Sequence, residues 1–364
     1  MLGRNSHDGA YFIAATGIDH GGARSLPRDG VAGLPSQRLA VEEDVVRPHG
    51  SPHFGHRLVE GAVLGIPYDG GTGFRPGSRF GPREIRSNST RYSAWGSWKG
   101  GGGYWDINRK KKMLDGVTIV DCGDVDIAYY DIDRNMRLIT QAVTAILDRG
   151  AFPVLLGGDH SVSFPIVRAF DRFAPLDIVH VDAHLDFIQD VEGMKFASGS
   201  PLRRIRELGF VRHMTHFGIR CLRSREGDYD DATRLGSRIF TREEIREEGS
   251  QGILKQVPEM GSIYVTIDID GLDPSIAPGT GSPTVDGLLY HEVRGLLQGV
   301  AAKGRVVGFD LVEVNPLVDV RDQTSLLATT LIAEFLGAIF DQRRAAGVGA
   351  TGKPTVARRG KRRS

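Results

Sequence analysis

The 364-residue chain contains little cysteine and has no long apolar run. Its two cysteines, Cys122 and Cys221, are far apart and have no partner pattern, which argues against a disulfide framework and against a thiolate metal site. No stretch approaches the roughly 18 apolar residues that a membrane-spanning helix needs, and the start of the chain lacks a basic region followed by such a run. We therefore expect a cytoplasmic protein that is neither secreted nor membrane-bound.

The chain also lacks an excess of charge of either sign. It has 46 Lys and Arg against 45 Asp and Glu, so the formal net charge of +1 gives no reason to expect nucleic acid or an anionic membrane as a partner. A hydrophobic content of 40% and a charged content of 25% are typical of a soluble globular protein with a full core. The length fits a single large α/β unit.

Composition divides the chain into three regions. Residues 1–58 are rich in Gly, Pro, His and Arg and have little periodicity, so we expect an irregular arm that is disordered or wraps a neighbouring subunit. Residues 343–364 form a basic tail, expected to be disordered and solvated, with contact to nucleic acid or an anionic surface as the alternative. Residues 59–342, between them, are predicted to form the one folded domain.

Within this domain, short apolar runs alternate with segments of helical spacing. The runs are rich in β-branched residues, as parallel strands covered on both faces are. They lie at residues 117–127, 153–158, 177–184, 262–270 and 305–314. Residues 134–149 and 325–340 carry apolar side chains at helical spacing. This alternation predicts a doubly wound, mostly parallel α/β sheet that binds ligands beyond the carboxyl ends of its strands.

Three of the predicted strands are followed by acidic or imidazole side chains. The motifs are GGDHS at residues 157–161, DAHLD at residues 182–186 and DID at residues 268–270. Taken alone, GGDHS fits a strand-to-helix turn in which Asp159 or Ser161 caps the helix, and DID fits a cap or a surface feature. Three such motifs in one chain, each after an apolar strand, favour a shared site.

Alternating residues of an extended strand point to the same face. Asp182, His184 and Asp186 can therefore converge, as can Asp268 and Asp270, and with the histidine of GGDHS they bring two imidazoles and four carboxylates into one crevice. Such carboxylates repel one another and need cations to stay ionised. Oxygen-rich ligands with a few imidazoles suit Mn²⁺, and Ni²⁺ or Co²⁺ are compatible. Two ions roughly 3.5 Å apart can share a water and lower its pKa.

At these motifs the chain resembles the ureohydrolases, the family of arginases and agmatinases, and the agmatinase branch more than the arginase branch. GGDHS, DAHLD and YVTIDIDGLDPSIAPGTGSP look like the three signature regions of that family. GIPYDGGTGFRPGSRFGPREIR, VDCGDVDI and VEVNP extend the resemblance from about residue 60 to residue 342. It implies a three-layer α/β fold of the arginase type and hydrolysis of a linear carbon–nitrogen bond in a guanidino compound, with release of an amine and urea or a urea-like product.

The resemblance also implies roles for individual residues. Two divalent ions, Mn²⁺ or alternatively Ni²⁺, would be held by His160, Asp182, His184, Asp186, Asp268 and Asp270. Asp182 and Asp268 are the expected bridging carboxylates, and Asp186 also matches a bridging position. Glu313 matches the carboxylate that orients the substrate guanidinium through two parallel hydrogen bonds. Hydroxide between the ions would attack the guanidino carbon, with Asp186 and Glu313 as the catalytic residues.

The sequence departs from the family pattern in the loop after DAHLD. The family carries a histidine there that is credited with passing a proton to the leaving amine, and Ser198 stands at that position. Serine cannot titrate near neutral pH, so the rate would fall by roughly 10²-fold to 10⁴-fold unless another group replaces the histidine. His20, His53 and His56 are candidates for that replacement. We expect Ser198 to contact the substrate.

The same loop bears on the substrate. Phe187 and Phe196 make it apolar, which argues against arginine, because its carboxylate and ammonium require polar partners. Agmatine and a guanidino acid remain open, and a biguanide of the dimethylbiguanide type or free guanidine are alternatives. Arg203 and Arg204 could bind a carboxylate, but we expect them on the next helix, paired with Glu207 or solvent.

Two other classes of protein compete with this interpretation. A deacetylase-like zinc hydrolase of the same fold would need a pair of adjacent histidines in a Gly-rich turn, and the sequence has none. A metal-binding or regulatory subunit of a hetero-oligomeric hydrolase would keep the ligands without turnover. The resemblance implies a homo-oligomer, a trimer or a hexamer, with a hetero-oligomer as the alternative.

Overall fold

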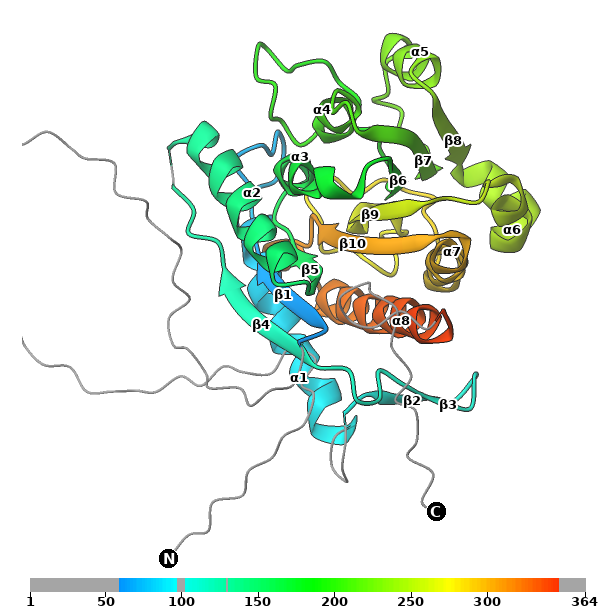
Figure 1. The fold of residues 1–364 in the computed structure, drawn as a ribbon. Coiled ribbons are helices and arrows are strands. Elements are labelled where there is room, and N and C mark those ends of the chain that lie inside the picture. Colours follow the sequence, from blue (N-terminus) through cyan, green and yellow to red (C-terminus); the bar gives the residue numbers. More distant parts are fainter. Residues whose placement is uncertain (1–58, 97–101, 129, 347–364) are drawn as a thin grey trace, which may run out of the picture.

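Eight parallel strands form the centre of the molecule (Figure 1). They are β1 (Gly61–Gly65), β4 (Ile119–Asp124), β5 (Phe152–Leu156), β6 (Leu176–Val181), β7 (Val211–Ile219), β8 (Ser237–Thr241), β9 (Ser262–Asp268) and β10 (Arg305–Val312). Their order in the sheet is β4-β1-β5-β10-β9-β6-β7-β8. This computed structural model describes residues 59–96, 102–128 and 130–346. The predicted N-terminal arm lies outside the described residues.

Helices cover both faces of the sheet and make three layers (Figure 1). One face carries α1 (Gly81–Gly96), α6 (Arg242–Gln256), α7 (Tyr290–Lys303) and α8 (Gln323–Ala345), and the other carries α2 (Ile132–Asp148), α3 (Ser163–Val167), α4 (Pro201–Arg206) and α5 (Glu226–Arg234). Successive residues of β1 enter opposite cores, because Val63 packs with the cluster of Phe340 and Leu64 with that of Ile139. The predicted three-layer α/β fold is confirmed.

Shorter elements complete the chain. They are the antiparallel pair β2 (Tyr104–Asp106) and β3 (Lys111–Met113), and the 3-10 turns η1 (Ser78–Phe80), η2 (His160–Val162), η3 (Arg168–Phe173), η4 (Ile269–Gly271) and η5 (Pro316–Val318). Two of these turns carry residues of the candidate site: η2, which is separated from β5 by three residues, and η4, which follows β9 directly.

The five predicted strands all form, but one expectation about them was wrong. We expected every one of them to be covered on both faces, whereas β4 is exposed over Cys122, Gly123 and Asp124. The reason is its place at the edge of the sheet, where it pairs with β1 alone. Strands β1, β7 and β8 were not among the predicted runs.

Helix α8 corrects two further expectations. By length and composition it could cross a membrane, although we expected no such stretch; 67% of its most apolar window is buried inside the protein, as in a core helix. It also continues to Ala345, so the first residues of the predicted tail are helical. The Arg343 guanidinium lies 4.6 Å from the ring centroid of Phe152 and donates to the Val306 carbonyl oxygen at 3.1 Å, which explains why the helix extends this far. The rest of the tail lies outside the described residues.

Candidate metal centre

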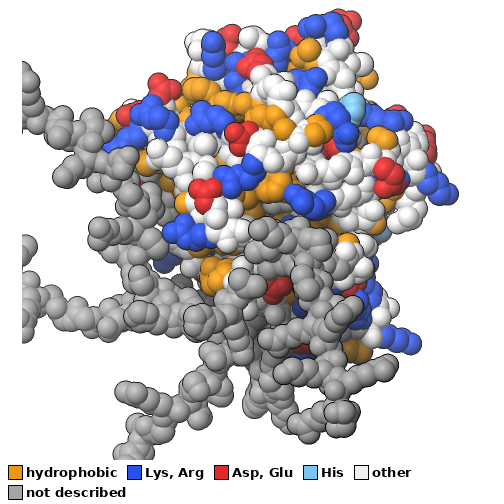
Figure 2. Space-filling model, viewed as in Figure 1, with side chains coloured by type: hydrophobic (Ala, Val, Ile, Leu, Met, Phe, Trp, Pro, Cys, Tyr) orange, Lys and Arg blue, Asp and Glu red, His pale blue; other side chains and the backbone are white. Residues whose placement is uncertain are grey.

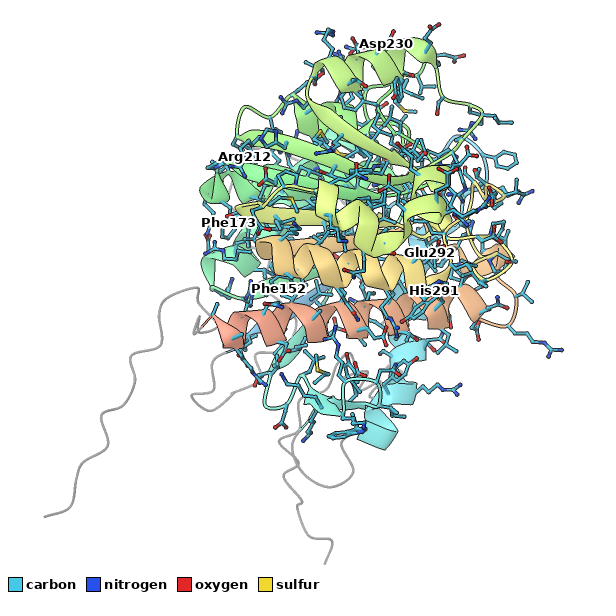
Figure 3. All side chains as sticks on the ribbon, turned by 90° about the vertical axis from the view of Figure 1, so that its right-hand side faces the viewer. Phe152, Phe173, Arg212, Asp230, His291 and Glu292 are labelled. Carbon is cyan, nitrogen blue, oxygen red and sulfur yellow. The ribbon has the colours of Figure 1, made fainter. Side chains whose placement is uncertain are left out.

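The six predicted metal ligands lie together at the carboxyl ends of three strands in the middle of the sheet. They are His160, Asp182, His184, Asp186, Asp268 and Asp270, which follow or end β5, β6 and β9. Figure 3 shows both ends of the strands. His291 and Glu292, in the first turn of α7, lie on the side where the strands end, and Arg212 and Phe173 lie on the side where they begin (Figure 3). The site therefore lies at the carboxyl ends of the strands, as predicted for an α/β sheet.

One group of ligand atoms surrounds the ring of His160. Its Nδ1 lies 2.9 Å from Asp186 Oδ2, 3.1 Å from Asp182 Oδ2 and 3.4 Å from Asp268 Oδ2. The imidazole is fully buried, yet Nδ1 has no hydrogen-bond partner of acceptable geometry among the described residues. A buried nitrogen without a partner that faces three carboxylate oxygens fits a bound cation.

A second group lies on the other side of Asp182. His184 Nδ1 is 3.4 Å from Asp182 Oδ1 and 3.1 Å from Asp270 Oδ2. Asp182 thus offers one oxygen to each group, as a bridging carboxylate would. Asp268 belongs to the first group alone, so its predicted bridging role stays a prediction.

The ligands converge through turns and not through an extended strand. Strand β6 ends before Asp182, whose Oδ1 accepts the backbone N–H of His184 at 2.5 Å, and Asp186 has a left-handed φ of 51°. In the same way Asp268 Oδ1 accepts the N–H of Asp270 at 2.8 Å and caps η4. The predicted proximity is confirmed, but strand alternation was the wrong reason for it.

Crowding shifts the pKa values in the cluster. Burial, together with neighbouring carboxylates, raises the pKa of Asp268 well above its ordinary value and also raises that of Asp270. Burial acts on Asp182 in the same direction, but His180, His160 and His184 outweigh it and hold the Asp182 pKa well below its ordinary value. The cluster therefore contains more negative charge than its imidazoles can offset, which is the condition that divalent cations relieve.

Glu313 lies beside this cluster, just beyond β10. Its backbone has a left-handed φ of 64°, and its Oε1 accepts the N–H of His160 at 2.9 Å. The residue is only 8% exposed, and burial, with the charge of Asp159, raises the pKa of its carboxyl well above the ordinary value. A planar cation at this carboxylate would stabilise its ionised form.

Two buried aspartates, which the sequence analysis did not assign to the site, hold the loop after β1 next to it. Asp159 accepts the N–H of Gly71 at 2.6 Å and that of Ser161 at 2.9 Å, so the cap that GGDHS allowed is present together with the site. Asp69 accepts the N–H of Gly77 at 2.7 Å and pairs with Arg79. An acidic residue inside a Gly-rich loop was the signal that could have identified Asp69.

Ser198 belongs to none of the groups of ligand atoms found among the described residues. Its backbone N–H donates to the Gly71 carbonyl oxygen at 2.9 Å, which places it against the loop that Asp159 anchors. The histidines considered as its replacement lie outside the described residues. Cys221 is a neighbour that the sequence did not indicate: burial would raise its pKa, but the hydrogen bond with His184 lowers it.

Arg203 and Arg204, which follow Ser198 in the chain, lie on the helix that the sequence analysis expected. Both are on α4, and Arg204 Nη2 lies 2.9 Å from Glu207 Oε1. Arg203 Nη1 is 2.7 Å from Asp231 Oδ2. These pairings leave the carboxylate-binding alternative for the two arginines without support.

Comparison with known proteins agrees with this geometry. The family model "Arginase family" matches residues 59–337. The proclavaminate amidinohydrolase of Streptomyces clavuligerus is 35% identical over 295 residues, which cover 79% of this chain and 90% of that protein. The guanidinobutyrase of Pseudomonas aeruginosa is 34% identical, over 76% of this chain and 86% of that protein. The solved structure of the S. clavuligerus enzyme has a TM-score of 0.68 at 35% identity, covering 76% of this chain and 91% of that one. The chain therefore belongs to the arginase family, hydrolases of carbon–nitrogen bonds in linear amidines.

Proposed function

We propose that residues 59–342 hydrolyse a linear carbon–nitrogen bond in a guanidino compound, with two divalent cations held by the six clustered side chains, and release an amine and urea or a urea-like product. The observation that carries the proposal is the pair of ligand groups that share Asp182 beside the buried carboxylate of Glu313. Two bound cations would lower the pKa of a water between them and so supply a nucleophile near neutral pH. Four carboxylates and two imidazoles suit Mn²⁺, with Ni²⁺ as the alternative.

The chain's own residues would orient the substrate. Glu313 would accept two parallel hydrogen bonds from the guanidinium and turn its central carbon toward the cluster. Asp186 has a side chain 11% exposed, against 0% for Asp182 and 3% for Asp268, so it is the carboxylate with most access to the tetrahedral intermediate. Ser198, which lies against the loop after β1, would line the substrate pocket.

Agmatine or a guanidino acid is the substrate class we propose. Relatives named agmatinase and guanidinobutyrase act on such compounds, and the loop with Phe196, which stacks on Phe164 at 5.7 Å, is apolar. Ser198 in place of a titratable group favours a second candidate, a biguanide or free guanidine, whose leaving group would need less help.

The partners we propose are small molecules. Side chains of both charge signs are interspersed on the described part of the face seen in Figure 2, in keeping with the formal net charge of +1. A surface of mixed charge does not attract nucleic acid electrostatically. Assembly as a homo-oligomer, with a hetero-oligomer as the alternative, and a cytoplasmic location remain predictions.

The test is product release from a panel of guanidino compounds by protein loaded separately with Mn²⁺ and Ni²⁺. The panel contains agmatine, guanidinobutyrate, guanidinopropionate, arginine, guanidine and dimethylbiguanide. We expect one compound to release an amine and urea or a urea-like product, and arginine to be inert. If protein that binds two ions per chain releases no product from any compound of the panel, the proposal is overturned and a non-catalytic subunit is favoured.

A further inference from the structure

A chain of hydrogen bonds runs from the candidate metal centre across two neighbouring strands. Asp182 Oδ2 lies 2.7 Å from His180 Nε2, His180 Nδ1 lies 2.9 Å from His216 Nδ1, and His216 Nε2 lies 3.0 Å from Ser237 Oγ. We call these three residues, His180, His216 and Ser237, the histidine chain. They come from β6, β7 and β8, and all are buried.

Sheet register brings these residues together. His180 and His216 are direct partners in the β6–β7 ladder, and Ser237 pairs with Met214, two residues before His216, in the β7–β8 ladder. The imidazoles pack edge to face with ring centroids 5.1 Å apart. The contacts therefore depend on the core of the sheet and not on a surface loop.

His180 differs from the neighbouring imidazole in how its ring is used. His160, His180 and Asp182 form one of the groups that could hold an ion. Both ring nitrogens of His180 are engaged in hydrogen bonds, whereas Nδ1 of His160 has no such partner among the described residues. His160 is therefore the metal ligand of the two, and His180 reaches the site only through its hydrogen bond with Asp182.

The proton positions along the histidine chain must be mutually consistent. An ionised Asp182 requires a proton on Nε2 of His180, and a neutral His180 then accepts at Nδ1. His216 must donate from its own Nδ1 and accept the Ser237 hydroxyl proton at Nε2. All three hydrogen bonds then point toward Asp182. Burial lowers the pKa of His216 well below its ordinary value, so this ring is neutral as the arrangement requires.

We infer that the histidine chain positions the Asp182 carboxylate so that one oxygen faces each of the two groups of metal-ligand atoms. This inference rests on the proposed function only in taking Asp182 as a metal ligand. A carboxylate shared by two ions loses one of them if it rotates, so restraint of its orientation supports both sites. Loss of such an outer partner typically costs about 10-fold to 100-fold in metal affinity.

Substitutions at His216 test the inference, because this residue touches no proposed ligand. His216→Leu removes the hydrogen bond to His180. His216→Asn can place an N–H near the position of Nδ1 and is the conservative variant. Ser237→Ala removes the outermost hydrogen bond and is the milder change if His216→Leu fails to fold. Thr215→Val is the matched control, since Thr215 is a buried neighbour on β7 whose side chain lies on the opposite face of the sheet.

Calorimetric titration of the metal-free full chain with Mn²⁺ is the first measurement, with circular dichroism to verify folding. We expect His216→Leu to bind Mn²⁺ about 10-fold to 100-fold more weakly. His216→Asn should recover most of that loss, Ser237→Ala should lie between it and the unsubstituted protein, and Thr215→Val should match the latter. Unchanged Mn²⁺ affinity in folded His216→Leu would overturn the inference.

Long-range ¹H–¹⁵N spectra of the metal-free protein with ¹⁵N-labelled histidine are the second measurement. We expect the proton of His180 on Nε2 and that of His216 on Nδ1, and the reverse assignment would overturn the inference. Neither measurement needs turnover, so the two proposals fail separately. Two bound Mn²⁺ ions without hydrolysis of any guanidino compound would refute the proposed function and leave the histidine chain intact.

Discussion

Among single residues, Glu313 has the sharpest predicted role. Glu313→Gln keeps the acceptor for the His160 N–H but removes the charge that would pair with a guanidinium. Because loss of one partner of a buried charged pair costs about 2–5 kcal/mol, we expect kcat/KM to fall on the order of 10²-fold. Urea release measures this, with Mn²⁺ affinity determined in parallel.

The metal measurement separates substrate binding from metal binding at Glu313. We expect Mn²⁺ affinity to stay close to that of the unsubstituted protein. Glu207→Gln, a half-exposed partner of Arg204 on the protein surface, is the control and should leave both quantities unchanged. A parallel loss of Mn²⁺ from Glu313→Gln would instead make Glu313 part of the metal site.

The carboxylate oxygens also predict which ligand is shared. Asp182 offers Oδ2 to the group of His160 and Oδ1 to the group of His184, whereas Asp270 reaches only the latter. Asp182→Asn should therefore weaken both Mn²⁺ sites, and Asp270→Asn should weaken one. The number of Mn²⁺ ions retained per chain after dialysis, determined by atomic absorption, checks this. Retention of one tight ion by Asp182→Asn would contradict a bridging Asp182.

The loop after β1 depends on Asp159 for its position. Asp159→Ala leaves the N–H groups of Gly71 and Ser161 without their acceptor. Because an unsatisfied buried donor costs about 1–3 kcal/mol, we expect a free energy of unfolding lower by that amount and faster amide exchange at Gly71. Asp148→Ala, at an exposed pair with Arg172, is the control. Unchanged Gly71 exchange in Asp159→Ala would show that other contacts hold the loop.

For the whole molecule, the clustered charges predict a pH dependence of stability without metal. The pKa of Asp268 is raised above its ordinary 3.8 and that of His160 above its ordinary 6.5, so both groups bind protons more tightly in the folded state. Their contributions to the free energy of unfolding are therefore present at low pH and are lost as pH rises through the raised pKa values. Asp182 has the opposite shift, but its contribution is lost only as pH falls below 3.8. The lowered pKa of His216 favours stability at higher pH, and the raised pKa values of Asp270 and Glu313 act against it together with those of Asp268 and His160.

Thermal melts at pH 5 and pH 8 test this dependence. We expect the metal-free protein to melt several degrees lower at pH 8, and Mn²⁺ to raise Tm more at pH 8 than at pH 5, because the ions displace protons from their ligands. Melts of Asp182→Asn with Mn²⁺ control for non-specific effects of the ion. A Tm of the metal-free protein that rises between pH 5 and pH 8 would refute the predicted coupling.

The layers of the fold and the members of the His/Asp cluster could be predicted from the sequence. Apolar periodicity is a local property, so residues 134–149 and 325–340 indicated the central parts of α2 and α8. DAHLD and DID indicated ligands because they follow apolar strands, whatever the path of the backbone. Both inferences need only neighbouring residues.

The contacts that hold the site could not be predicted from the sequence. The turns at Asp182 and Asp268, the exposed edge at β4 and the anchoring of the loop by Asp159 depend on contacts between segments far apart in the chain. The same is true of His180 and His216, which meet because the register of β6 and β7 pairs them. Register and burial are properties of the packed sheet, and no local pattern in the sequence specifies them.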